Sequence, residues 1–290
     1  MRVRERRDVL PGPPARRPAP EALGRARDAE RRTSRARTEQ ALHRDQSDAR
    51  EVVHRRHVGD GEAAVLERTA QPVAAAGLKA MAWTESAHQV GGPTQAGADC
   101  AAWCRETFRV KGTLPEAIER AGAALREHAP LFLPYLAGER APVWSSGVRG
   151  AFHRVDRAHT PDDFLWSTME GVAHAVRDIL ALAQSAADLR AHELRACGGG
   201  ARSDAWCALK ADVLGIPVIR TQVAETGLVG AAMAAAVGLG LHRDLRQAAA
   251  RMVRRERRFA PRARFAAAYA ARAAQYDAIK RLALALPDDT

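Results

Sequence analysis

The sequence has 290 residues, of which 47% are hydrophobic, and its formal net charge is +11 at pH 7. This length and apolar content allow one large or two small globular domains with a sizeable core. The most apolar window, residues 228–241, is shorter than the roughly 18–20 residues of a spanning helix. No apolar region follows the basic N-terminus, so the pattern predicts neither a membrane segment nor a secretory signal.

The first 82 residues have a composition unlike the rest of the chain. They contain no aromatic residue and no isoleucine, arginine recurs every few residues, and no lysine precedes Lys79. Such a composition cannot build a core, so we expect a disordered or loosely helical arm over residues 1–82. One interpretation is a basic tail that binds phosphates, although such tails usually cluster their charge. The interpretation that the composition favours is translation of a GC-rich gene in the wrong frame or from an arbitrary start.

Periodic apolar spacing begins after Trp83, and we expect a domain over residues 83–290. Thr160, Pro161, Asp162 and Asp163 form a strong helix start, with a cap, a proline in the first turn and two acids. Strands are expected over 150–156, 194–197 and 216–220. Helices are expected over 98–108, 114–127, 161–184, 203–214, 226–237 and 265–282, with loop around 131–149 and a basic connector over 241–261. Alternating strands and helices predict an α/β domain.

Three consecutive glycines stand at one of the strand-to-helix junctions, in the stretch RACGGGARSDAW over residues 195–206. Without side chains, a flat or charged ligand can approach the main chain there, and a nucleotide is a natural candidate. The spacing matches neither the dinucleotide fingerprint nor the phosphate loop. From these residues alone, a nucleotide site and a tight packing turn remain open alternatives.

Several stretches taken in order narrow this choice: LFLPYLAGERAP, RGAF, MEGVAHAVRDIL, GGGARSDAW, LKADVLGIPV and ETGLVGAAMAAAVGLG. Together they resemble the C-terminal domain of the FGGY carbohydrate kinases, and the xylulokinase branch in particular, over about residues 88–286. The resemblance implies the actin-like ATPase fold of ribonuclease H type, represented here by an incomplete C-terminal domain. It also implies ATP-dependent phosphoryl transfer to a sugar hydroxyl, with D-xylulose as the expected acceptor and ATP and Mg²⁺ as cofactors.

The resemblance also implies site residues. It places Gly198, Gly199, Gly200 and Ala201 in the adenosine motif, and Ser203 where a polar residue approaches the adenine. Gly97 is the expected contact from the stretch VGGPTQAGADCAAWCRETF, although relatives often carry a polar residue where this chain has Ala102. Gly138, Glu139 and Arg140 match a loop that we interpret as shaping the cleft side of the domain.

Other parts of the family pattern are not recognisable. The sugar-binding residues and the general-base aspartate are not found before Trp83, and no phosphate turn is found over residues 59–75. No catalytic residue and no metal ligand is therefore assigned. The alternative hypothesis is a catalytically inactive, truncated or frame-shifted fragment with at most weak nucleotide binding.

The remaining expectations concern location, partners and isolated polar residues. The four cysteines form no CxxC pair, which favours a reducing, cytoplasmic compartment. ATP and a sugar are the expected partners, membrane and nucleic-acid binding are not expected, and homo-oligomerisation stays open. Cys100 and Cys104 are expected in the core rather than at a metal. A set of acids is expected on helix surfaces: Asp162, Asp163, Glu170 and Asp178. If the arm has replaced the first strands of the sheet, the strand over 150–156 should lie near a sheet edge.

Overall fold

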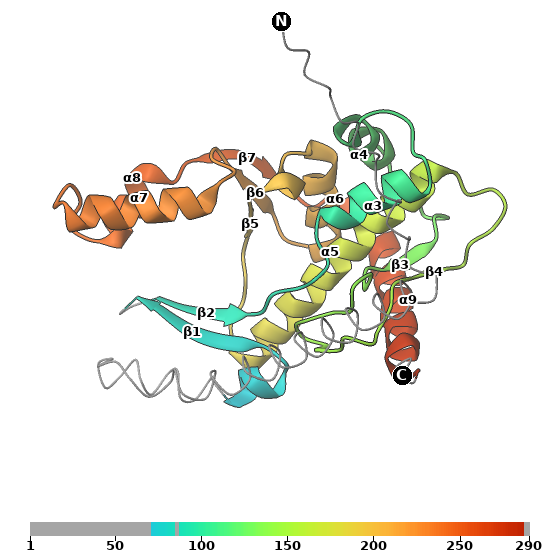
Figure 1. Cartoon of the computed structure of the whole chain (residues 1–290), viewed down its shortest axis with the longest axis horizontal. Helices are drawn as coiled ribbons and strands as arrows, with labels where there is room; N and C mark the ends of the chain where they lie inside the picture. Colours follow the sequence, from blue (N-terminus) through green and yellow to red (C-terminus); the bar gives the residue numbers. More distant parts are fainter. Residues whose placement is uncertain (1–70, 85–86, 287–290) are drawn as a thin grey trace, which may run out of the picture. The chain divides into compact units, whose positions relative to one another are not determined.

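The computed structural model describes residues 71–84 and 87–286, and Figure 1 labels their helices and strands. Residues 1–70, which make up most of the predicted arm, lie outside the described residues. Strand β1 (Lys79–Thr84) pairs antiparallel with β2 (Ala87–Gly91) and lies across the boundary predicted between residues 82 and 83. Val73 and Leu78 are buried in a small apolar cluster. The expectation that the chain builds no core before residue 82 is therefore wrong for these residues.

A second pair of strands precedes the longest helix. Strand β3 (Leu131–Leu133) pairs antiparallel with β4 (Ala151–His153), and among the described residues no further strand joins them. The strand predicted over 150–156 is thus confirmed in shorter form, and it lies at a sheet edge. Strand β3 was expected to be loop, because three residues are too few to show a period.

The third sheet carries the glycine turn. Strand β5 (Leu194–Ala196) runs parallel to β6 (Val218–Thr221), and β7 (Arg255–Phe259) pairs antiparallel on the other side of β6. Strands β5 and β6 confirm the prediction. The prediction of a connector over 241–261 is wrong, because the segment holds helix α8 (Leu245–Met252) as well as β7. Four of the five β7 residues are charged, which hides the alternation typical of a strand.

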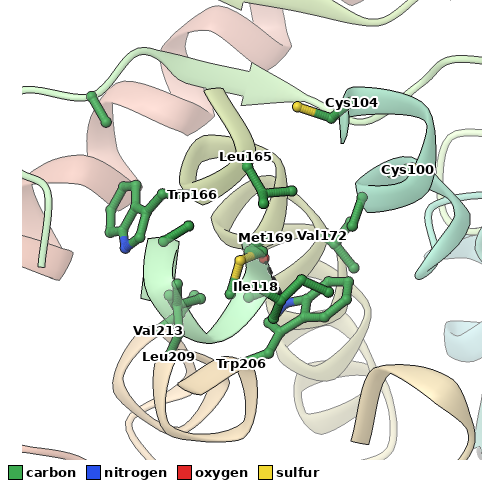
Figure 2. Close-up of a cluster of buried hydrophobic side chains, with 14 of the residues drawn as sticks. Cys100, Cys104, Ile118, Leu165, Trp166, Met169, Val172, Trp206, Leu209 and Val213 are labelled. Carbon is green, nitrogen blue, oxygen red and sulfur yellow. Dashed lines mark hydrogen bonds between the residues drawn. The ribbon is translucent and has the colours of Figure 1, made fainter. Parts of the chain in front are cut away.

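Helix α5 (Pro161–Ala186) lies at the centre of the main core. It begins with a capping box between Thr160 and Asp163, as the sequence predicts. Around it pack α3 (Asp99–Thr107), α4 (Leu114–Gly122) and α6 (Asp204–Leu214), while α9 (Ala266–Ala285) contacts α6 and β3. Side chains from α3, α4 and α6 meet those of α5 in this cluster, where Trp206 Nε1 donates to the Met169 carbonyl at 3.0 Å (Figure 2).

Glycine at position 171 allows α5 to approach β3. A Cβ atom there would lie 2.4 Å from the Phe132 carbonyl oxygen, well inside contact distance. A larger residue would therefore force the helix away from the strand.

Three of the four acids expected on helix surfaces are buried, so that expectation is wrong for Asp163, Glu170 and Asp178. Glu170 is 1% exposed and forms two hydrogen bonds with the guanidinium of Arg272 from α9, at 2.5 and 2.6 Å. Burial opposes the charge of Glu170, but the bonds from Arg272 outweigh it and hold the pKa of the carboxyl below its usual value. The pair ties the C-terminal helix to α5.

Helix α7 (Thr226–Gly238) confirms a predicted helix and packs against α8. None of its residues is buried in the described part of the chain. Across the described residues, no helix has the length and apolar content needed to cross a bilayer.

Candidate functional site

The three glycines lie between β5 and α6, as predicted. Gly198 has φ +73° and ψ −168°, a conformation that a residue with a side chain rarely adopts. Residues Gly199–Ala201 then form one 3-10 turn. A Cβ atom added at Gly198 or Gly199 would meet no atom of the described residues within 4 Å. One side of the turn therefore offers open main chain.

Two cationic side chains bind the carbonyl oxygens of this turn. Lys210 Nζ, from α6, donates to the Gly200 carbonyl at 3.0 Å and lies 4.6 Å from the centre of the Trp206 ring. Burial lowers the pKa of Lys210. Arg220, from β6, donates to the Ala201 and Arg202 carbonyls at 3.4 and 3.2 Å. The turn is thus fixed by its carbonyl oxygens.

Neither cation was assigned a role from the sequence. Lys210 stands four residues after Trp206, so both lie on one face of α6, and that spacing indicates the contact between Lys210 and the Trp206 ring. It does not indicate the bond to the Gly200 carbonyl. Arg220 reaches the turn from the neighbouring strand, 19 residues from Ala201 in sequence. No local signal predicts that contact.

The segment around Gly97 is held by the loop at Glu139. Glu139 is 5% exposed, and its carboxylate accepts hydrogen bonds from Thr94 Oγ1 at 2.9 Å and from the Gln95 N–H at 2.7 Å. It also accepts from the N–H of Arg140 at 2.8 Å. The predicted Gly138–Arg140 loop therefore fixes the chain that leads into Gly97 and α3.

The structure brings the two predicted glycine segments together. A Cβ atom at Gly200 would lie 3.7 Å from the Cβ of Ala98, next to Gly97. The turn also borders a cavity of about 290 Å³. Of the predicted site residues, Gly198 and Ala201 line this cavity, whereas Gly97, Gly199, Gly200 and Ser203 do not. The cavity lining consists of Ala196, Cys197, Gly198, Ala201, Arg202, Arg220, Thr221, Gln222, Ala224 and Glu256.

The first turn of α6 already has hydrogen-bond acceptors. Ser203 is its N-cap, and Ser203 Oγ accepts from the Trp206 N–H at 3.0 Å. The Ala205 N–H donates to a Glu119 carboxylate oxygen at 3.3 Å. A carboxylate at this helix end takes the place that a phosphate group would occupy. The arrangement therefore suits a neutral, flat part of a ligand better than its phosphates.

Cys100 and Cys104 are buried in the main core, as predicted, and burial raises the pKa of both thiols to about 11. Among residues 71–84 and 87–286, no three His, Cys, Asp or Glu side chains come close enough to hold a metal ion.

Comparison with known proteins places this chain in a family. The model of the C-terminal domain of the FGGY family of carbohydrate kinases matches residues 65–239. A glycerol kinase of Xanthomonas campestris pv. campestris (strain 8004) is 33% identical over 159 residues, which are 55% of this chain and 32% of that protein. A xylulose kinase of Bacillus subtilis (strain 168) is 31% identical over 162 residues, 56% of this chain and 32% of that protein. The chain thus matches about a third of the length of these relatives.

Solved structures agree on the fold. The gluconate kinase from Lactobacillus acidophilus superposes with a TM-score of 0.65 at 24% identity, covering 72% of this chain and 42% of that one. The Plasmodium falciparum glycerol kinase with ADP gives a TM-score of 0.59 at 17% identity, covering 71% of this chain and 42% of that one.

Proposed function

The chain belongs to the FGGY family of carbohydrate kinases and has the actin-like ATPase fold of their C-terminal domain, and from this premise we propose that its glycine turn binds the adenosine of ATP. The proposed contacts are Gly97 on one side of the turn and Gly198, Gly199, Gly200 and Ala201 along it. The Ser203 hydroxyl caps α6, so its proposed part is to position the turn at the edge of the adenine site.

One observation carries this proposal: Gly198 and Gly199 offer open main chain, and Gly198 lines a cavity. Lys210 and Arg220 fix the turn through its carbonyl oxygens, and Arg220 also lines the cavity. Such a surface suits the face of a purine or ribose, because a planar group can lie against backbone that carries no side chains. The phosphates would extend away from the N-terminus of α6, where Glu119 already accepts a hydrogen bond.

A substitution at Gly199 tests this proposal without disturbing the fold. A Cβ atom at Gly199 meets no described atom, so Gly199→Val should leave the melting temperature unchanged while filling the space proposed for the nucleotide. We expect the affinity for a fluorescent ADP analogue to fall at least about tenfold, which is about 1.4 kcal/mol. Gly230→Val, at a similarly open glycine on α7, is the matched control and should bind as the unmodified chain does. Equal binding by both variants would overturn the proposal.

The proposed reaction of the kinase is phosphoryl transfer from ATP to a sugar hydroxyl, with D-xylulose as acceptor and the cytoplasm as location. Among the described residues no three His, Cys, Asp or Glu side chains form a cluster. We assign neither a Mg²⁺ ligand nor a general base to this part of the chain. We therefore assign nucleotide binding to this chain, and we expect that the chain alone does not turn over ATP.

An assay of ADP release separates these parts of the proposal. The purified chain is mixed with ATP and Mg²⁺, and D-xylulose, glycerol or gluconate is added in turn. Nucleotide binding without release of ADP supports the role of a nucleotide-binding fragment. Sugar-dependent release of ADP would overturn that role, and release with glycerol or gluconate but not D-xylulose would overturn the proposed acceptor.

A further inference from the structure

Strand β7 forms one edge of the sheet that carries the glycine turn. Among the described residues, β6 is its only partner, so its outer edge has unpaired main-chain groups. Five successive residues, 254–258, are exposed, and four of them are arginines. The ladder with β6 reaches Arg254, whose carbonyl accepts from the Gln222 N–H at 3.0 Å. An open strand edge and a concentration of positive charge thus coincide.

Part of this charge is already neutralised within the molecule. Arg255 pairs with Glu193 at 3.0 Å, and Arg257 pairs with Asp204. No acidic side chain of the described residues pairs with Arg254 or Arg258. Segment 243–264 contains nine arginines and only two acids, so these two remain in a strongly positive field.

The arginines project from both faces of the strand. Arg257 lies on the face of Phe259, 5.1 Å from the centre of its ring, and the residue between them, Arg258, points to the opposite face. A polyanion resting on one face of the sheet would reach only one of these rows. A segment lying in the plane of the sheet, along the open edge, would reach both.

We propose that the outer edge of β7 binds an acidic peptide segment in extended conformation, which adds to the sheet as a further strand. Main-chain hydrogen bonds to the open edge would hold the segment, and acidic side chains on its two faces would meet Arg254 and Arg258. A second copy of β7 does not fit this edge, because its arginines would face arginines. Glu256 of β7 lines the cavity beside the glycine turn, but Arg254 and Arg258 do not, so the proposed peptide contacts do not depend on the proposed function.

The experiment uses a fluorescent, blocked peptide in which pairs of glutamates alternate with pairs of valines, so both faces of the extended peptide carry glutamate. Its binding to the full chain is measured by anisotropy. We expect the double variant Arg254→Glu with Arg258→Glu to bind about tenfold more weakly, because two attractive pairs become repulsive. The control, Lys111→Glu with Arg281→Glu, makes the same charge change at exposed residues outside segment 243–264 and should bind as the unmodified chain does. Circular dichroism confirms that both variants fold.

A second probe separates strand addition from simple charge attraction. The same peptide with consecutive backbone nitrogens methylated keeps its charge, but neither of its edges can donate hydrogen bonds to the ladder. We expect it to lose at least about tenfold in affinity, and we expect the unmodified peptide to protect backbone amides of β7 from hydrogen exchange. Equal affinity for the methylated peptide would overturn the proposal. Binding of a single-stranded oligonucleotide that needs Arg254 and Arg258, without binding of the peptide, would overturn it in favour of a nucleic-acid surface.

Discussion

Helices α5 and α7 are both continuous, yet they contribute differently to the molecule. Fourteen of the 26 residues of α5 are buried, whereas none of the 13 residues of α7 is, and Leu228 on α7 is 72% exposed. Helix α7 contains no charged residue and is apolar on all sides, a pattern typical of helices that are enclosed. The difference shows that a helical pattern predicts the helix but not its burial, and that stability is concentrated around α5.

The largest effect is expected where α5 meets α9. Arg272→Met would leave the Glu170 carboxylate buried without its arginine partner and would remove a donor from the Glu127 and Ala129 carbonyls. We expect a loss of about 3–5 kcal/mol in the free energy of unfolding, measured with urea. The double variant Glu170→Leu with Arg272→Met should recover part of the loss, since no charge stays buried. A loss equal to the sum of the single variants would show that the ion pair is not coupled in this way.

A matched pair of leucines compares the two helices directly. Leu165 on α5 is 0% exposed, so Leu165→Ala should create a cavity and cost about 2–5 kcal/mol. Leu228→Ala on α7 removes the same atoms from an exposed site and should change stability by less than about 0.5 kcal/mol. Urea unfolding of both variants gives the comparison. Similar losses for the two would mean that α7 is packed against a partner in solution.

The start of α5 should make stability depend on pH. Burial opposes the charge of Asp163, but hydrogen bonds from Thr160 and the pair with Arg126 outweigh it and lower the pKa of Asp163 to about 2. Because this pKa is lowered on folding, the stabilisation is present above about pH 4 and is lost as the pH falls towards 2. The expected difference is about 2 kcal/mol. Asp163→Asn should flatten this part of the urea stability curve between pH 5 and 2, and an unchanged slope would contradict the assignment.

Local signals account for the parts of the fold that the sequence predicted. The cap at Thr160 marks the start of α5, and Gly215, with φ +67°, ends α6 where the sequence places its end. What was missed depends on contacts distant in sequence: β3 needs β4 as its partner, and Glu170 meets Arg272 102 residues later. The local sequence around a buried acid does not differ from that around a surface acid. Only the partner, found in the structure, distinguishes the two.

In the candidate site, too, local sequence signals predicted some features, and contacts distant in sequence account for those that were missed. Glycines between a strand and a helix indicate open main chain, and the structure shows it at Gly198 and Gly199. That Gly97 belongs beside the same turn was predicted only from family resemblance, because no spacing rule links two segments about a hundred residues apart. The contacts of Lys210 and Arg220 with the turn required the structure.

The smallest expected effect comes from two alanine-to-glycine substitutions, which distinguish local opening of α7 from unfolding of the whole domain. Ala181 on α5 and Ala234 on α7 are both exposed alanines within helices. Ala181→Gly should lower the free energy of unfolding by about 1 kcal/mol, the usual difference in helix propensity. Ala234→Gly should leave it unchanged, because a helix with no buried residue opens before the core unfolds, and the cost should appear only as faster amide exchange within α7. Equal losses in urea would instead mean that α7 unfolds together with α5, as one cooperative unit.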